Sequence, residues 1–392
     1  MGPRLRRRAR DASTPRAPTS VVLVLVAKSI SFARGAPSLD IIDVEGLRAA
    51  SDRAFAADPA GVTAYGTAIG YAPLREWIAE RHRVEPEQVM VTNGSMQADA
   101  FLFDALVEPG DAVIVERPTY DRTLLSLRGR GADVRAVELE ADGIDVAAVE
   151  RVLAAGATPK LAHIIPNFQN PAGCTLSDAK RTALLELAQY AGFVIFEDDP
   201  YVALRFEGEP LPTMLSMDGD TVVYASSFSK TVCPGIRVGY LVGPAELIAR
   251  IVEIATGTYI SPSMVSQAIV HQFCISGSLD SSIETVRAAL RERAHTLCDA
   301  LRRELPEGRF VEPEGGYFLW LDLPRGTDVD AMFTAASERG VQFVRGSDFV
   351  LEGGESSLRL AYSGVTPEEI EDGVRRLAEA YREVTQEVES AA

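Results

Sequence analysis

Hydrophobic positions follow two alternating patterns along the middle of the chain. Short apolar runs such as VMVT, AVIV and FVIF, which are rich in β-branched and aromatic residues, predict buried β-strands. Between these runs, apolar residues recur every three or four positions, as in MQADAFLFDAL and LSDAKRTALLELAQYAG, and predict helices. Because strands and helices alternate from about Val84 to Gly243, we expect an α/β fold with a mostly parallel central sheet and helices on both faces.

The pattern changes from about Ser281. A long helix rich in arginine and glutamate comes first, followed by predicted strands at VQFVRG and SSLRLAYS and predicted helices at DVDAMFTAASERG and TPEEIEDGVRRLAEAYREV. This mixture is typical of a smaller α+β domain. We therefore predict a large domain over residues 59–283 and a small domain over 284–392. A segment over 30–58 is expected to pack with the small domain, after a tail over 1–29.

The first residues of the chain resemble a signal peptide only in part. MGPRLRRRARDASTPRAPTS is basic and rich in proline, and the apolar run VVLVLVA follows it. That run is short for a signal peptide, and no small-residue cleavage site follows it cleanly. We interpret residues 1–20 as a partly disordered tail and Val21–Ala27 as a strand or docking arm. No apolar run approaches the roughly 18–20 residues of a membrane span. The four cysteines, without metal spacing, are typical of reduced thiols in a cytosolic protein, so we predict a cytoplasmic location.

Composition and charge exclude several classes of function. The 392 residues carry a formal net charge of −17, which argues against a nucleic-acid footprint. The four cysteines show no C-x-x-C or metal spacing, and the four histidines form no H-E-x-x-H pattern. We therefore predict reduced thiols and no metal site.

Candidate chemistry lies at the ends of five predicted strands, where open α/β sheets bind ligands. VTNGSMQ places a glycine and a serine at a helix start, which is suited to an anion because backbone amides and the helix dipole point there. The other strand ends bear a tyrosine, an asparagine, an aspartate and a serine–lysine cluster. The candidates are Gly94, Ser95, Met96, Tyr120, Asn170, Asp198, Ser227, Ser229 and Lys230.

Lys230 stands out because lysine is rare in this chain. Only four of the 39 lysine and arginine residues are lysines, and one of them follows SSFS. A desolvated lysine can lose its proton and become a nucleophile, whereas the arginine guanidinium stays protonated. The position therefore indicates covalent or proton-transfer chemistry.

Nine fragments together resemble one family of enzymes. In order along about residues 30–365 they are ISFARGAP, YGTAIGYAPLR, VTNGSMQ, VEPGDAVIVERPTY, PNFQNPAG, FEDDPY, SSFSKTVCPGIRVGY, PEGGYFLW and LRLAYS. This set resembles the fold-type I enzymes that use pyridoxal 5'-phosphate. More closely, it is similar to the class I/II aminotransferases near the 2-aminoadipate and multi-substrate group. The resemblance implies pyridoxal phosphate as the cofactor and a fold with a large and a small domain.

The resemblance also implies roles for the residues around the cofactor's ring. Lys230 would form the Schiff base with the cofactor. Asp198 would pair with the pyridine nitrogen; its neighbour Asp199 competes for this role, but only Asp198 stands three residues before Tyr201, as in the family. Tyr201 and Asn170 would hydrogen-bond the phenolic oxygen.

Other residues match the family's contacts to the phosphate and to the substrate. Tyr120 would stack on the pyridine ring, and Tyr65 would reach the phosphate of the other subunit, which implies a homodimer. Arg359 would bind the substrate's α-carboxylate, and Gly35 would lie near the substrate. The phosphate would be held by Gly94, the backbone amides of Ser95 and Met96, the hydroxyls of Ser95, Ser227 and Ser229, and Arg237.

The chain departs from the family pattern at three positions. Arg34 stands where glycine is usual, Arg345 where proline is usual, and Met96 where glutamine is common. Arg34 either meets a second acidic group of the substrate or is a salt-bridged surface arginine.

Three functions fit these features. The first is an aminotransferase that moves an amino group between an L-amino acid and a 2-oxo acid by a ping-pong mechanism. The second is a pyridoxal-phosphate enzyme of secondary metabolism that catalyses elimination, replacement or carbon–carbon bond formation. The third, a regulator with an aminotransferase-like domain, is disfavoured because only about 30 residues precede ISFARGAP, too few for a DNA-binding winged helix, and the chain is acidic. The sequence does not identify the amino donor or the amino acceptor, and it favours broad substrate specificity.

Overall fold

A computed structural model describes residues 29–391, with residues 387–391 given as helical backbone only. The predicted tail over 1–20 and the strand or arm at Val21–Ala27 lie outside this range. Within it, no helix has both the length and the apolar character needed to cross a bilayer.

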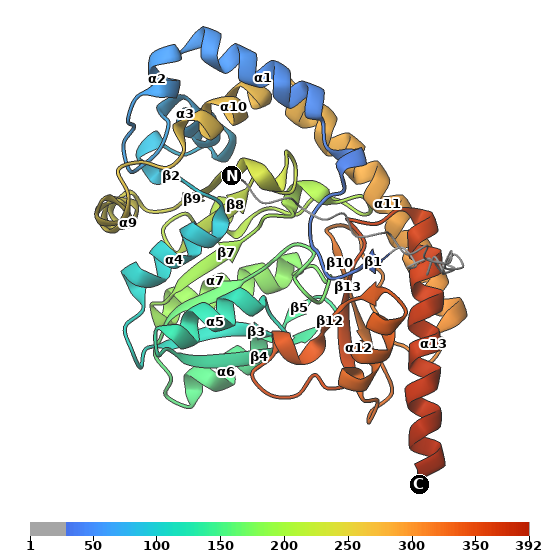
Figure 1. Ribbon diagram of the computed structural model, residues 1–392. Helices are drawn as coiled ribbons and strands as arrows, with labels where there is room; N and C mark the ends of the chain where they lie inside the picture. Colours follow the sequence, from blue (N-terminus) through green and yellow to red (C-terminus); the bar gives the residue numbers. More distant parts are fainter. Residues whose placement is uncertain (1–28, 392) are drawn as a thin grey trace, which may run out of the picture.

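An eight-stranded sheet forms the centre of the molecule (Figure 1). Its strands β8, β7, β6, β3 and β4 are parallel neighbours, while β9 runs antiparallel between β2 and β8, and β5 is antiparallel to β4. The mostly parallel sheet expected from the sequence is therefore confirmed. In sheet order, the strands are β2 (Val89–Thr92), β9 (Gly239–Val242), β8 (Val222–Ser227), β7 (Val194–Asp198), β6 (Pro159–Ile164), β3 (Ala112–Arg117), β4 (Asp133–Glu140) and β5 (Gly143–Ile144).

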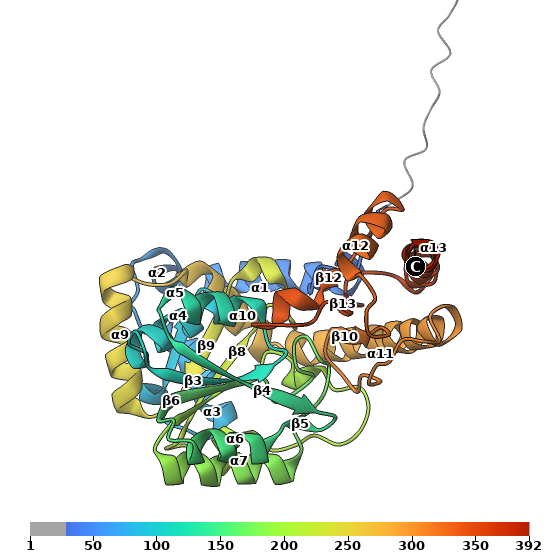
Figure 2. The ribbon, with the colours of Figure 1, turned by 90° about the horizontal axis from the view of Figure 1, so that it is seen from below.

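Helices cover both faces of this sheet, as Figure 2 shows for α6 and α7 on one side and α4 and α5 on the other. The alternation of side chains along each strand produces two cores. In β3, Val113 and Val115 join the core under α4, whereas Ile114 joins the core under α3 and α7. The helices are α3 (Ala72–His82), α4 (Ser95–Leu106), α5 (Asp121–Gly129), α6 (Val146–Ala154), α7 (Asp178–Ala191), α8 (Met214–Met217) and α9 (Ala245–Thr258).

The C-terminal part contains a second, smaller sheet with the order β10–β13–β12. The run VQFVRG, expected as one strand, is divided into β11 and β12 around the buried Phe343; that expectation was wrong. The division arises because the two halves pair with different strands, β11 with β1 and β12 with β13. The elements are β10 (Phe318–Asp322), β11 (Val341–Gln342), β12 (Val344–Arg345), β13 (Ser357–Ala361), η5 (Gly346–Phe349), α11 (Ser278–Glu304), α12 (Val329–Glu338) and α13 (Pro367–Ala391).

The N-terminal segment contacts both parts of the molecule. Strand β1 (Ile30–Ser31) pairs with β11, and Phe32 is buried in the core of the C-terminal part. Helix α1 (Val44–Ala57) then packs along α10 (Met264–Ile275), as Figure 1 shows at the top of the molecule. Helix α2 (Pro59–Thr63) follows. The predicted domain boundaries stay an interpretation of the sequence.

Candidate active site

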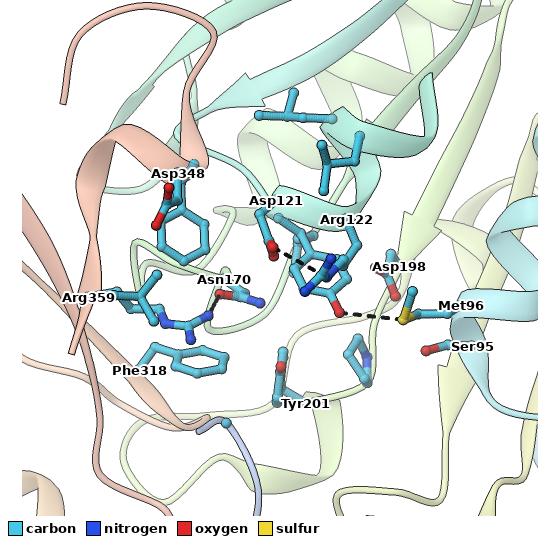
Figure 3. Close-up of a pocket in the computed structure, with 18 of the residues that line it drawn as sticks. Ser95, Met96, Asp121, Arg122, Asn170, Asp198, Tyr201, Phe318, Asp348 and Arg359 are labelled. Atoms are coloured by element: carbon cyan, nitrogen blue, oxygen red, sulfur yellow. Dashed lines mark hydrogen bonds and ion pairs between the residues drawn. The ribbon is translucent and has the colours of Figure 1, made fainter. Parts of the chain in front are cut away.

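A cavity of ≈ 720 Å³ opens at the carboxyl ends of the parallel strands (Figure 3). Its lining comes from the loops and helix starts that follow β2, β3, β6, β7 and β8, together with residues of the N-terminal segment and of the C-terminal part. Twelve residues singled out in the sequence line it: Gly35, Ser95, Met96, Tyr120, Asn170, Asp198, Tyr201, Ser227, Ser229, Lys230, Arg237 and Arg359.

Three other candidates do not line the cavity. Gly94 is buried and directly precedes the lining residue Ser95, while Arg34 is exposed next to the lining residue Gly35. No ion pair of Arg34 is found within residues 29–391. Tyr65 is 85% exposed, in the turn between α2 and α3.

One end of the cavity is a polar cradle at the start of α4. Ser227 Oγ donates to Ser229 Oγ at 2.9 Å, and Arg237 Nη1 donates to Ser229 Oγ at 3.3 Å. Gly94 adopts φ 89°, and a Cβ there would lie 2.2 Å from Arg237 Nη2. The positive φ and the close guanidinium both favour glycine beside the helix start, where backbone amides attract anions.

Lys230 extends into the middle of the cavity. Its Nζ donates to the Gly35 carbonyl at 2.7 Å and lies 5.6 Å from the centre of the Tyr201 ring. Burial, together with the nearby positive charge of Arg359, lowers the pKa of Lys230 to about 8, while Asp198 acts in the opposite direction. At neutral pH the unprotonated fraction of this amine is therefore larger than that of an ordinary lysine.

Asp198 lies at the floor of the cavity, at the end of β7. Its Oδ2 is 3.4 Å from Nε2 of the fully buried His163, on the adjacent strand β6. Its Oδ1 is buried and has no hydrogen-bond partner in the described part of the chain. The competing Asp199 does not line the cavity and instead accepts a hydrogen bond from Asn167 at 2.9 Å.

Arg359, on β13, forms the opposite end of the site. Its guanidinium donates to Asn170 Oδ1 at 2.9 Å and to the Ala33 carbonyl at 2.8 Å. The rings of Phe318 and Phe349 lie 4.3 and 4.8 Å from its Cζ. No ion pair to Arg359 is found among residues 29–391, so a buried cation lies in the cavity wall without a carboxylate of its own.

Comparisons with known proteins agree with this geometry. The family model for aminotransferase class I and II matches residues 27–377. The chain belongs to this family. A 2-aminoadipate transaminase from Thermus thermophilus is 34% identical over 359 residues, which are 90% of each chain. An aromatic-amino-acid aminotransferase from Thermococcus litoralis is 33% identical over 92% of this chain and 90% of its own.

The solved structures similar to this aminotransferase include one with a cofactor derivative. The α-aminoadipate aminotransferase of Thermus thermophilus, in complex with N-(5'-phosphopyridoxyl)-L-leucine, has a TM-score of 0.88 and 34% identity. The superposition covers 91% of this chain and 93% of the other. The chain is therefore a pyridoxal-phosphate-dependent aminotransferase of fold type I, as the resemblance implied.

The cavity of the aminotransferase fits this cofactor by its own chemistry. The cradle that a Cβ at Gly94 would fill suits a phosphate, and Lys230 supplies an amine of lowered pKa. The buried, unpartnered Asp198 Oδ1 is an acceptor suited to a protonated ring nitrogen.

Some residues of the aminotransferase site were not found from the sequence. His163 was overlooked although it is the one polar side chain in the apolar run LAHII. Phe318 lies within the fragment PEGGYFLW but received no role, and Phe349 gave no signal, because their contacts with Arg359 join distant segments. Arg345 pairs with Asp330 at 2.9 Å outside the cavity, which accounts for this departure from the family pattern.

Proposed function

We propose that the aminotransferase moves the amino group of an L-amino acid to a 2-oxo acid with Lys230 as the residue that carries the proton. The observation that supports this most is the position of Lys230 Nζ. The amine lies in the cavity that Asp198 and Arg359 also line, and burial lowers its pKa to about 8. Such an amine is able to accept a proton near neutral pH.

We assign the remaining candidates to the cofactor. Pyridoxal phosphate, when bound, supplies an electron sink that stabilises negative charge on the substrate's Cα. Asp198 holds the ring nitrogen protonated, and Tyr120 covers the ring. Asn170 and Tyr201 hydrogen-bond its phenolic oxygen. Gly94, Ser95, Met96, Ser227, Ser229 and Arg237 hold the phosphate.

Arg359 is the proposed partner of the substrate's α-carboxylate. The planar guanidinium suits bidentate binding of a carboxylate. Asn170 and the Ala33 carbonyl fix its orientation, and the two phenylalanine rings exclude water from its faces. Gly35 forms the wall beside it. Arg34 stays a candidate for a second acidic group of the substrate.

During turnover, Lys230 Nζ accepts the proton that the substrate's Cα releases and then returns a proton to the reacting molecule. The neighbouring cation Arg359 keeps Nζ less basic, so the amine gives the proton up again. Because one amine accepts and then donates, no second general base is required. The family's ping-pong order follows from using the same site for both substrates.

We also propose a homodimer in which Tyr65 completes the partner's site. Tyr65 is 85% exposed, and Met96, which lines the cavity, is 48% exposed. Ile260 and Val265, which precede and begin α10, add exposed apolar surface. A cytoplasmic location stays a prediction.

The test replaces Lys230 with alanine and uses Lys180→Ala as the control, because Lys180 pairs with Glu140 and Asp142 away from the cavity. We expect Lys230→Ala to lose the absorbance of the lysine-bound cofactor and to lower kcat by about 10³-fold or more. In the unaltered enzyme, the single-turnover rate should rise with pH through about 8, because only unprotonated Nζ accepts a proton. Retention of both absorbance and turnover in Lys230→Ala would contradict the proposal.

A further inference from the structure

Asp99 is a buried acid close to the candidate site to which no role has been assigned. It lies on α4, one turn after Ser95, and is 7% exposed. Its Oδ1 is buried and has no hydrogen-bond partner, and no ion pair to it is found within residues 29–391. A carboxyl group buried in this way costs free energy, so it needs an explanation.

The packing of α4 on the sheet places Asp99 beside Asp198, at the same position along the direction of strand β7. Phe103 lies one turn further along the same face of α4, and its ring packs edge-on against that of Phe196 on β7, with centroids 5.9 Å apart. Asp198 lies two residues after Phe196, on the same face of the strand.

The two spacings match. Moving from Phe103 back to Asp99 covers about 6 Å of helix, and moving from Phe196 on to Asp198 covers about 6.6 Å of strand. Both moves lead toward the cavity, because Ser95 and Asp198 both line it.

The nearest arginine on this side of α4, Arg130, bonds the Ala100 carbonyl and pairs with Asp104 rather than with Asp99. Asp198 approaches from β7 and the Tyr120 phenol from the start of α5. The histidine on β6, His163, contacts Asp198, with its Nε2 3.4 Å from Asp198 Oδ2. Burial raises the pKa of Asp99 well above its usual value, and the charge of Asp198 raises it further. Two carboxyl groups so placed cannot both ionise easily, so Asp99 keeps its proton to a higher pH than an ordinary aspartate does.

We propose that Asp99 is a positioning residue for the amino-transfer reaction, a neutral acid that lets Asp198 alone carry the negative charge of this carboxyl pair. The proposal rests on the role assigned above to Asp198 toward the ring nitrogen. At neutral pH, the pair then presents one charge to one protonated nitrogen. A second charge arises only when the pH rises to the raised pKa of Asp99.

The sign of its effect on stability distinguishes this role from a structural one. In the unfolded chain Asp99 ionises near its usual value of 3.8, whereas in the folded protein it ionises at a higher pH. Between the two values the folded state binds more protons, so stability falls as the pH rises through this window. Asp99 therefore destabilises the folded protein at neutral pH, whereas an aspartate that served the structure would stabilise it.

The experiment compares the cofactor-saturated enzyme with its Asp99→Asn variant. The control is Asp104→Asn, which changes an exposed acid on the same helix that pairs with Arg130 at 2.6 Å. One measurement titrates the visible absorbance of the bound cofactor with pH, and the other follows the unfolding temperature with pH. Asp99→Leu serves as a second variant of similar size if the asparagine variant folds poorly.

We expect Asp99→Asn to match the unaltered enzyme in absorbance below the pH at which Asp99 ionises and to lack the transition that accompanies this ionisation. Its unfolding temperature should be higher at neutral pH, and the gain should vanish toward pH 4. Identical titrations at every pH, a shift already present in acid, or a lower unfolding temperature at neutral pH would each overturn the proposal. The absorbance of the lysine-bound cofactor in these variants tests the role of Lys230 separately. The proposal for Lys230 and the proposal for Asp99 can therefore be contradicted independently of each other.

Discussion

At the scale of single residues, the site is organised around two cations of different kinds. Lys230 titrates near neutral pH, because burial and Arg359 lower its pKa to about 8. Arg359 remains charged, and its partners Asn170 and the Ala33 carbonyl are neutral oxygens. One cation is therefore able to exchange a proton while the other offers a fixed charge to a carboxylate.

Arg359→Lys tests the fixed charge. Lysine keeps the charge but loses the planar pair of donors and the packing between Phe318 and Phe349. We expect kcat/KM to fall about 10- to 100-fold, since a charged hydrogen bond contributes about 1.5–3 kcal/mol. The absorbance of the bound cofactor should be unchanged. Steady-state kinetics with several amino acids measures this effect.

Arg345→Lys is the matched control, because the ion pairs of Arg345 with Asp330 and Asp348 are largely exposed and lie outside the cavity. An equal loss in both variants would contradict the assignment of Arg359.

Lys230 and Asp198 could be predicted from the sequence because each belongs to a local motif with a chemical requirement. Asp99 could not, because its significance depends on which face of α4 packs against β7. His163 could have been noticed in the sequence, because a histidine buried within an apolar strand needs a polar partner. Asp199 shows the limit of spacing arguments: only the structure shows that it contacts Asn167 rather than the cavity.

At the scale of elements, the starts of helices and the ends of strands position the chemistry. The helix expected between Ser177 and Gly192 was confirmed as α7, and Gly192 ends it with φ 76°. The division of VQFVRG into β11 and β12 could not be foreseen, because the partners β1 and β13 are distant in sequence. Local pattern thus predicts an element's type well, but it does not predict its pairing.

Gly94→Ala tests the helix start that forms the phosphate cradle. A Cβ at this position would lie 2.2 Å from Arg237 Nη2, so the guanidinium has to move away. We expect the affinity for pyridoxal phosphate to fall about 10-fold or more, because one charged contact is lost. Equilibrium dialysis of the cofactor measures the change.

Gly110→Ala provides the control for backbone strain. Gly110 also has a positive φ, of 91°, but a Cβ there would meet no atom within 4 Å. This variant should lower thermal stability by about 1–2 kcal/mol and leave cofactor affinity intact. If both variants bound the cofactor equally well, the assignment of this cradle to the cofactor's phosphate would be wrong.

At the scale of the whole molecule, the cavity is formed by three separate parts of the chain. The N-terminal segment supplies Ala33 and Gly35, the region of the large sheet supplies the cofactor residues, and the C-terminal part supplies Arg359. The sequence predicted the α/β class and the change of character near Ser281. It did not predict that α1 would pack along α10, since neither helix carries a local sign of its partner.

Mixed dimers test whether Tyr65 acts across subunits. Lys230→Ala and Tyr65→Ala homodimers should both be weakly active. In a mixed dimer, one site carries both changes and the other carries neither. We therefore expect about half of the unaltered activity per dimer, because a twofold dimer has two equivalent sites.

Two affinity tags isolate the mixed dimer, and the two parent homodimers are the controls. No recovery of activity in the mixed dimer would show that Tyr65 acts within its own subunit. A single-subunit mass in light scattering would contradict the dimer itself.

The hydrogen bond from Arg359 to the Ala33 carbonyl joins residues 326 positions apart. During synthesis on the ribosome, every residue of the phosphate cradle up to Arg237 leaves the exit tunnel well before Arg359. Since domains fold largely in the order in which they emerge, the part that holds the cofactor forms earlier than the part that holds the substrate. We therefore expect the phosphate cradle of a nascent chain to form before the part that carries Arg359.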